Sequence, residues 1–129
     1  MRVLLDTHAY LWFIAGDERL SARGREVIAS PDADLLFSAA SLWEIAVKHS
    51  IGKLPLTRPF ADLFPAQPVA DGLRTLPIQA PHLARLVDLP FHHRDPFDRM
   101  IIAQALVEGV PVLTRDPAFE HYPVETVWD

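Results

Sequence analysis

Residues 2–8 read RVLLDTH and set a pattern that recurs along the chain. Arg2–Leu5 is a run of Val and Leu that suits a strand buried on both faces of a sheet. Asp6 follows this run directly, and Thr7 begins an apolar helical segment that reaches about Ala15. A buried strand that passes through an acidic residue into a helix is typical of parallel sheets, which bind ligands at the carboxyl ends of their strands.

The other predicted elements follow the same alternation. Further strands are expected at Asp34–Ser38, Val110–Thr114 and Val124–Trp128, and an edge strand, where proline is tolerated, at Leu73–Ile78. Helices are expected at Thr7–Ala15, Ser21–Ser30, Ala39–His49, the proline-interrupted Thr57–Gly72, Pro81–Asp88, Pro96–Glu108 and, as a short helix or turn, Pro117–His121. This alternation predicts one α/β domain over residues 1–129, with a parallel sheet and helices on both faces.

Composition and motifs exclude several classes of site. Cysteine is absent, which excludes a disulfide framework, a thiolate zinc site and a cysteine nucleophile. No Gly-rich phosphate loop, HExxH pattern or nucleophile elbow occurs. The apolar N-terminal stretch resembles a short signal peptide, but Asp6 and His8 interrupt it and no clean cleavage pattern follows. We therefore expect a cytoplasmic protein.

The net charge of −5, from 12 basic and 17 acidic residues, argues weakly against a partner made of nucleic acid. Phosphate affinity normally comes from Lys and Arg. Metal ions bound by acidic residues would cancel part of this charge where a phosphate lies. The basic residues that recur near the acidic positions are Lys48, Lys53, Arg58, Arg94, Arg99 and Arg115. Local charge thus argues weakly for nucleic acid.

Four acidic residues, Asp6, Glu44, Asp98 and Asp116, lie just after a predicted buried strand or one turn into a helix that leaves the sheet. Carboxylates gathered at one edge of a sheet repel one another unless a cation neutralises them. Oxygen ligands of this kind suit a hard divalent metal, and such metals serve phosphate-ester chemistry. The joint placement of these residues, rather than any one of them, predicts a metal site.

Each acidic residue also has a local interpretation. Asp6 suits the N-cap of the helix that follows it, and Asp116 suits a turn before proline. Glu44 forms a capping-box pattern with Ser41 and a favourable i,i+4 pair with Lys48. If that helix instead begins directly after the strand, Glu44 lies in its second turn and the capping box fails.

Asp95 and Asp98 are assigned different roles. Asp95 precedes Pro96 and is the natural N-cap of the helix. Asp98 is one turn further on, above a core-facing stripe that contains Ile102. We therefore assign Asp98 to the metal site and Asp95 to a supporting role.

The histidines and aromatic residues carry weaker signals. His92 and His93 are adjacent and do not easily converge on one ion, so we expect loop residues in solvent or contacts to phosphate. The aromatic residues at helical spacing are predicted to belong to the core or to an interface; they are Trp12, Phe13, Trp43 and Phe97.

Several segments together resemble PIN-domain proteins, and within them the VapC-type toxins of bacterial type II toxin–antitoxin modules. These segments, in chain order, are VLLDTH at 3–8, SLWEIAVK at 41–48, GKL at 52–54, HRDPFDRMIIAQA at 93–105 and LTRD at 113–116. The resemblance spans essentially the whole chain, and the combination of LLDTH with DPFDRMIIAQA is its specific part. Arg115 departs from the pattern, because family members often carry a small or amide residue there.

The resemblance implies a three-layer α/β/α fold with a central parallel sheet of about five strands and a metal-dependent endoribonuclease. It implies that Asp6, Glu44, Asp98 and Asp116 form the catalytic and metal-binding quartet, with hydroxyl support from Thr7 and Thr114. The expected cofactor is Mg²⁺ or Mn²⁺, since both prefer carboxylate and water ligands. The expected partners are an RNA substrate, a second copy of the chain in a homodimer and a VapB-like antitoxin whose tail lies in the active-site groove.

Two other functions are weighed against this one. A phosphatase of the haloacid dehalogenase type also begins with a strand and an Asp, but its chemistry needs a second Asp where this chain has His8. A catalytically silent PIN-like module would bind RNA or a protein without cutting. All four acidic residues are present, so nothing in the sequence indicates a loss of activity.

Overall fold

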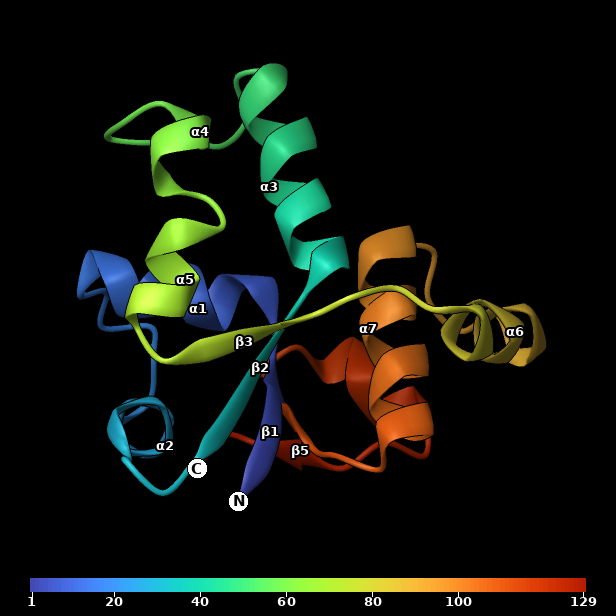
Figure 1. Cartoon of the computed structure of the whole chain (residues 1–129). Coiled ribbons are helices and arrows are strands. Elements are labelled where there is room, and N and C mark those ends of the chain that lie inside the picture. The colour runs from blue at the N-terminus through green and yellow to red at the C-terminus, as the bar shows by residue number, and fades with distance from the viewer.

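A computed structural model describes residues 1–129, which form a five-stranded parallel sheet between two layers of helices (Figure 1). The strand order is β3-β2-β1-β4-β5, and every neighbouring pair is parallel. The strands are β1 (Arg2–Leu5), β2 (Asp34–Ser38), β3 (Leu73–Leu76), β4 (Val112–Leu113) and β5 (Thr126–Val127). The predicted α/β/α architecture with a parallel sheet of about five strands is therefore confirmed.

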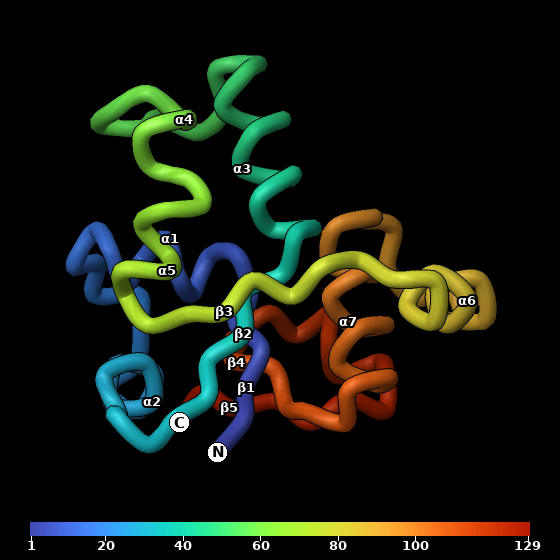
Figure 2. The backbone as a smooth tube through the Cα atoms, in the orientation of Figure 1, coloured from blue at the N-terminus to red at the C-terminus, as the bar shows by residue number.

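The helices lie on both faces of this sheet, as the tube in Figure 2 also shows. They are α1 (Thr7–Ala15), α2 (Ala22–Ala29), α3 (Ala39–Ser50), α4 (Phe60–Leu63), α5 (Ala66–Ala70), α6 (Ala80–Asp88), α7 (Pro96–Glu108) and the 3₁₀ helix η1 (Pro117–His121). Helices α1 and α2 lie on one side of the sheet, and α6 and α7 lie on the other (Figure 1).

Two hydrophobic cores form, one on each face of the sheet, because successive side chains of a strand point to opposite faces. Val3 and Leu5 of β1 pack in one core with buried residues of α1 and α2, such as Tyr10. Leu4, between them, packs in the second core with residues of α7 such as Ile101. These three side chains of β1 are fully buried, as expected of a central strand covered on both faces.

Some predicted boundaries are wrong. Only two residues of each of the predicted strands Val110–Thr114 and Val124–Trp128 pair in the sheet, as β4 and β5. The prediction that prolines break up the helical segment Thr57–Gly72 is confirmed, since it contains two short helices, α4 and α5. The edge position of β3 is confirmed.

The cores also correct part of the aromatic assignment. Trp12 and Phe13 are half-buried and pack against the first core. Trp43 is 55% exposed and so lies outside the core, and its place at an interface stays a prediction. Its ring partner is Phe97, edge-on at 4.7 Å between centroids. No helix of the structure combines the length and the apolar character that crossing a bilayer requires.

The carboxyl ends of the strands determine where the acidic residues lie. Leu5 of β1 pairs with Leu113 of β4, so the next residues, Asp6 and Thr114, leave the sheet side by side. Helix α3 begins directly after β2 and extends beyond this same edge (Figure 1). The sheet edge therefore gathers residues that are far apart in the sequence.

Candidate metal centre

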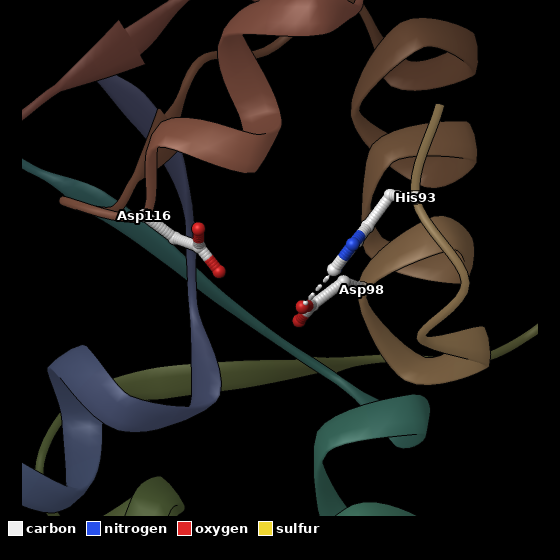
Figure 3. A group of neighbouring side chains, drawn as sticks. All are labelled: His93, Asp98 and Asp116. Atoms are coloured by element: carbon white, nitrogen blue, oxygen red, sulfur yellow. Dashed lines mark hydrogen bonds and ion pairs between the residues drawn. The ribbon is translucent and has the colours of Figure 1, made fainter. Parts of the chain in front are cut away.

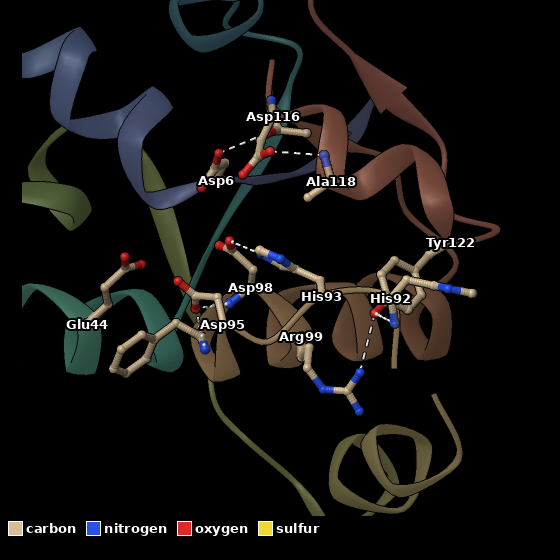
Figure 4. A network of polar contacts seen from close by, with 12 residues as sticks. Asp6, Glu44, His92, His93, Asp95, Asp98, Arg99, Asp116, Ala118 and Tyr122 are labelled. Carbon is tan, nitrogen blue, oxygen red and sulfur yellow. Dashed lines mark hydrogen bonds and ion pairs between the residues drawn. The ribbon is translucent and has the colours of Figure 1, made fainter. Parts of the chain in front are cut away.

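Five carboxyl groups meet at the carboxyl edge of the sheet, from four segments of the chain (Figure 4). Asp6 comes from the junction of β1 and α1, Glu44 from α3, Asp95 and Asp98 from the start of α7, and Asp116 from the segment after β4. Figure 4 shows the carboxyl groups of the predicted quartet directed toward a common space. The structure thus places all four residues that the sequence singles out at this edge, but of the four only Asp98 and Asp116, together with His93, have ligand atoms within 4.8 Å of one another. The role of the four as metal ligands stays a prediction.

Asp6 occupies the N-cap position of α1 but its side chain does not cap that helix. Thr114 Oγ1 instead donates a hydrogen bond of 2.8 Å to Asp6 Oδ2, and Asp6 is only 6% exposed. The other carboxyl oxygen, Oδ1, is buried without any hydrogen-bond partner. The local cap interpretation of Asp6 is wrong, and the side chain is held toward the acidic cluster.

Glu44 lies in the second turn of α3, because Ser38 rather than Ser41 caps this helix. The capping-box interpretation of Glu44 is therefore wrong. Glu44 Oε2 pairs with Lys48 Nζ, which confirms the predicted i,i+4 pair, and Glu44 Oε1 is buried without a partner. The Ser41 hydroxyl accepts a hydrogen bond of 2.7 Å from Thr7 Oγ1, which fixes α3 relative to the residue after Asp6.

The start of α7 separates its two acidic residues as predicted. Asp95 Oδ1 accepts hydrogen bonds from the backbone N–H groups of Phe97 and Asp98, at 2.8 and 3.0 Å, and so caps the helix. The side chain of Asp98 is free of that task. Its Oδ2 lies 2.8 Å from Nε2 of His93 (Figure 3).

The carboxyl group of Asp116 both caps a helix and faces the acidic centre. Its Oδ1 accepts a hydrogen bond from the backbone N–H of Ala118 at 2.9 Å, which caps η1 and confirms the predicted turn role. Its carboxyl group also faces Asp98 and His93, and one ligand atom from each of these three residues lies within 4.8 Å of the others (Figure 3). The backbone N–H of Asp116 donates to Thr114 Oγ1, so a single hydroxyl joins Asp116 to Asp6.

Burial and mutual repulsion disfavour the charged forms of these carboxyl groups. Burial raises the pKa of Asp6, and the negative charges of Glu44 and Asp116 raise it further, although the Thr114 hydrogen bond partly opposes them. Burial likewise raises the pKa of Asp98 to about 7, with repulsion from Asp6 and other acids of the cluster in the same direction.

Lys48 supplies one positive charge to the cluster. Burial alone would lower the pKa of Lys48, but the hydrogen bond and charge of Glu44 outweigh it and raise the pKa. This single ammonium group is shared with one oxygen of Glu44. Its charge also acts on Asp95 and Asp98, but one ammonium group does not neutralise all the carboxyl groups of the cluster.

The donor set fits a hard divalent cation. Two buried carboxylate oxygens, Asp6 Oδ1 and Glu44 Oε1, have no hydrogen-bond partner, and a buried polar atom of this kind is costly unless something satisfies it. Carboxylate oxygens are the ligands that Mg²⁺ and Mn²⁺ prefer. A cation bound by these residues would satisfy the unpaired oxygens and relieve the repulsion.

A groove of about 1000 Å³ opens beside this centre, between α1 and the segment from α3 to α5. His8 and Lys48, neighbours of the acidic residues, line it together with exposed Lys53 and Arg58. Lys48 is paired with Glu44, whereas Lys53 and Arg58 have no carboxylate partner. Acidic and apolar side chains also line the groove, so Lys53 and Arg58 are the unpaired cations that it offers to a chain of phosphates.

Two other basic residues named from the sequence behave differently. Arg99 is only 7% exposed and donates to the backbone carbonyl of Pro90, so it holds the preceding loop and does not face a phosphate. The guanidinium of Arg115 lies 4.5 Å from the centroid of the Trp12 ring. Local charge at the site thus comes from fewer residues than the sequence indicates.

The sequence interpretation missed His93. Its ring contacts Asp98 within the acidic centre, so the expectation of a solvated loop residue is wrong for His93, whereas a contact to phosphate stays a prediction. The spacing of five residues between His93 and Asp98, with a helix cap between them, could have indicated that the ring folds back over the first turn of α7. The role of Ser41 in linking α3 to Thr7 was also missed.

Comparison with known proteins gives one family. The PIN domain family model matches residues 3–125. The chain is 32% identical to the ribonuclease VapC22 of Mycobacterium tuberculosis over 130 residues, which cover 98% of both chains. Two solved structures share the fold. One is VapBC2 of Rickettsia felis bound to a DNA fragment from its promoter, with 15% identity, full coverage of both chains and a TM-score of 0.74. The other is VapC20 of Mycobacterium tuberculosis, a toxin that cleaves the sarcin–ricin loop, with 16% identity, 98% and 99% coverage and a TM-score of 0.70.

Proposed function

The chain belongs to the PIN-domain family, and we propose that it is a metal-dependent endoribonuclease acting as the toxin of a type II toxin–antitoxin pair. The name of its relative, a VapC ribonuclease matched over nearly the whole length, supports the activity. The observation in this chain that carries the proposal is the pair of buried, unpartnered carboxylate oxygens on Asp6 and Glu44. A cation bound at this edge of the sheet would satisfy such oxygens.

In this proposal Asp6, Glu44, Asp98 and Asp116 hold the metal, with Mg²⁺ or Mn²⁺ as the ion. When bound, a divalent ion of this kind supplies an activated water and neutralises charge on the phosphate and the leaving oxygen. Hydrolysis by water breaks the P–O3′ bond, so the products carry a 5′-phosphate and a 3′-hydroxyl. The ribose 2′-hydroxyl takes no part in this step.

The residues around the quartet keep it in place. The hydroxyl of Thr114 donates to Asp6 and accepts a hydrogen bond from the backbone N–H of Asp116. It therefore fixes the positions of these two acidic residues relative to each other, although they come from different segments. The bond from Thr7 to Ser41 holds α3, and with it Glu44, against the start of α1. Preorganisation of this kind lowers the cost of assembling the site.

The RNA strand is proposed to leave the acidic centre along the groove that Lys53 and Arg58 line. The proposed protein partner is a VapB-like antitoxin, because solved relatives of this fold are VapBC complexes. An antitoxin tail in the same groove would exclude RNA, and a basic side chain on it would pair with the acidic cluster. The proposal includes a homodimer of single-domain chains.

Cleavage with and without metal tests the proposal. Purified protein should cut RNA in the presence of Mn²⁺ or Mg²⁺ and stop in excess EDTA, and sequencing of the products should find 5′-phosphate ends. Asp6→Asn and Asp98→Asn, made separately, should each lower the rate by at least about 100-fold, since even the loss of a group that only orients a metal ligand costs about 10- to 100-fold. A variant of either kind that cuts as fast as the parent would contradict the site.

The second candidate, a silent PIN-like binding module, predicts a different result. It would bind RNA or an antitoxin tightly and show no metal-dependent cleavage. The unpartnered oxygens of Asp6 and Glu44 favour the enzyme, because a module without a metal has no reason to bury them. Asp32→Asn, which removes one exposed negative charge away from the site, is the matched control for both variants.

A further inference from the structure

We propose that His93 is a ligand of the metal ion at this centre, which then has a mixed donor set of carboxylate oxygens and one imidazole nitrogen. The inference rests on the proposed metal-dependent function and adds to it. A mixed set changes which divalent ions the protein prefers, because imidazole favours Mn²⁺ and later transition metals over Mg²⁺.

The distances match those between ligands of one ion. His93 Nε2 lies 2.8 Å from Asp98 Oδ2. In an octahedral site with bonds of about 2.1 Å, neighbouring ligands lie about 3 Å apart and opposite ones about 4.2 Å apart. Ligand atoms of His93, Asp98 and Asp116 all lie within 4.8 Å of one another, so small side-chain movements bring them onto one ion (Figure 3).

The loop that carries His93 is anchored on both sides. The backbone N–H of His92 donates to the Tyr122 hydroxyl at 3.1 Å, and the His92 ring packs against Tyr122 with centroids 5.4 Å apart. Buried Arg99 donates to the carbonyl of Pro90 at 3.0 Å, just before the loop. Figure 4 shows the result: the His92 ring is turned away from the acidic residues and the His93 ring toward them.

The unpaired oxygens of Asp6 and Glu44 are a second, independent indication of a bound cation. Both atoms are buried, their residues are only 6% and 2% exposed, and neither has a hydrogen-bond partner. His93 lies on the opposite side of Asp98 from these two residues (Figure 4). The group whose ligand atoms lie within 4.8 Å of one another is His93, Asp98 and Asp116, so an ion held by this group has the imidazole beside Asp98.

A role for His93 in orienting Asp98, without binding the metal, would give a different spectroscopic result. If the ring only orients Asp98 through a hydrogen bond, no nitrogen would touch the metal. The electron spin echo of bound Mn²⁺ separates the two cases, since an imidazole ligand couples its ¹⁴N nucleus to the unpaired electrons. The expected result is a ¹⁴N modulation in the parent protein that disappears in His93→Gln.

Metal affinities provide the second readout, without any RNA. Titration of metal-free protein should give tighter binding of Mn²⁺ than of Mg²⁺. His93→Gln should weaken Mn²⁺ binding by about 10-fold or more and Mg²⁺ binding by much less, so that the preference shrinks. His92→Gln is the matched control, because its ring contacts Tyr122 and His121 instead of the acidic residues.

The outcomes separate this inference from the proposed function. Binding of Mn²⁺ without ¹⁴N modulation, or an unchanged Mn²⁺ to Mg²⁺ ratio in His93→Gln, would overturn the role of His93 and leave the metal site intact. Modulation that persists in His93→Gln would also overturn it and would point to His8. Absence of any Mn²⁺ binding to the parent protein would overturn both, and circular dichroism of each variant shows whether it is folded.

Discussion

Thr114 Oγ1 donates a 2.8 Å hydrogen bond to Asp6 Oδ2, although the two residues are 108 positions apart in the sequence. The contact exists because β1 and β4 are neighbours and pair in parallel, with Leu5 opposite Leu113. The same hydroxyl accepts the backbone N–H of Asp116 at 3.1 Å. One buried hydroxyl thus connects two carboxylates of the proposed metal centre.

Thr114→Val should weaken the centre while keeping the shape of the side chain. Loss of the hydroxyl leaves Asp6 Oδ2 and the N–H of Asp116 without a partner, so the free energy of unfolding should fall by roughly 1–3 kcal/mol. Metal affinity or cleavage rate should fall by about 10- to 100-fold, as at other sites that lose an orienting partner. Urea unfolding and cleavage assays measure these effects. Thr114→Ser keeps the hydroxyl and should stay near the parent protein in both.

The stability of metal-free protein should fall as pH rises from about 4 to about 7. Burial raises the pKa of Asp98 from 3.8 to about 7, so in this range the folded form keeps a proton that the unfolded form has released. The unfolded state binds fewer protons there, and the free energy of unfolding decreases with pH, by on the order of 1.4 kcal/mol per pH unit per group. Urea unfolding in EDTA at several pH values measures the slope.

Asp98→Asn supplies the control for this slope, which should become shallower in the variant. Asp17 does not obscure the result, because its hydrogen bonds to Arg19 lower its pKa to about 2. The stability that this pair contributes is lost only as pH falls from about 4 toward 2, outside the window. A slope that Asp98→Asn leaves unchanged would mean that another group titrates.

Divalent metal should stabilise the fold. A cation that binds only the folded state raises the free energy of unfolding by about 2.7 kcal/mol when its concentration is 100 times its dissociation constant. Thermal melts should therefore shift upward on addition of Mn²⁺, and the shift should shrink in Asp6→Asn. Asp32→Asn removes an equal charge from an exposed position and should keep the full shift. A melt of the parent protein that ignores millimolar Mn²⁺ would count against the centre.

The groove cations should set the salt dependence of RNA binding. Replacement of Lys53 and Arg58 by Gln removes two exposed positive charges that have no carboxylate partner. Affinity for single-stranded RNA should fall, and the slope of log affinity against log salt should become shallower by about 0.7 for each phosphate that the protein no longer neutralises. Binding is measured in the Asp98→Asn background, so that the RNA is not cut.

Arg85→Gln is the control for the groove variants, because Arg85 lies on α6, on the opposite side of the sheet from α1 (Figure 1). This change should leave the slope unaltered. Equal slopes for the groove variant and the control would place the RNA elsewhere.

Local patterns predicted the bounds of α1 and α7 but not those of the short strands β4 and β5. Gly16 and Gly109 end α1 and α7 in the left-handed conformation, at φ of 63° and 66°, where glycine is favoured. The short strands β4 and β5 were overestimated, because the apolar pattern of a segment shows where it is buried but not how far its neighbour extends to pair with it.

Caps were the hardest feature to interpret at the acidic positions. Asp95 and Asp116 cap the helices that follow them, whereas Asp6 stands in the same kind of position and makes no cap bond. An Asp before a helix has the same local appearance in each case. What separates them is a partner from elsewhere in the chain, here the hydroxyl of Thr114.

Periodicity and composition alone determined the alternation of buried strands and helices, the parallel sheet, and the four acidic residues at its edge. These features follow from short-range effects, namely which residues avoid water and which suit a strand or a helix start. Only the tertiary structure decided that Asp6 turns to Thr114, that Ser38 caps α3 and that His93 reaches Asp98. Side-chain direction at a strand end depends on neighbours supplied by the sheet order, and the sheet order is a property of the whole folded chain.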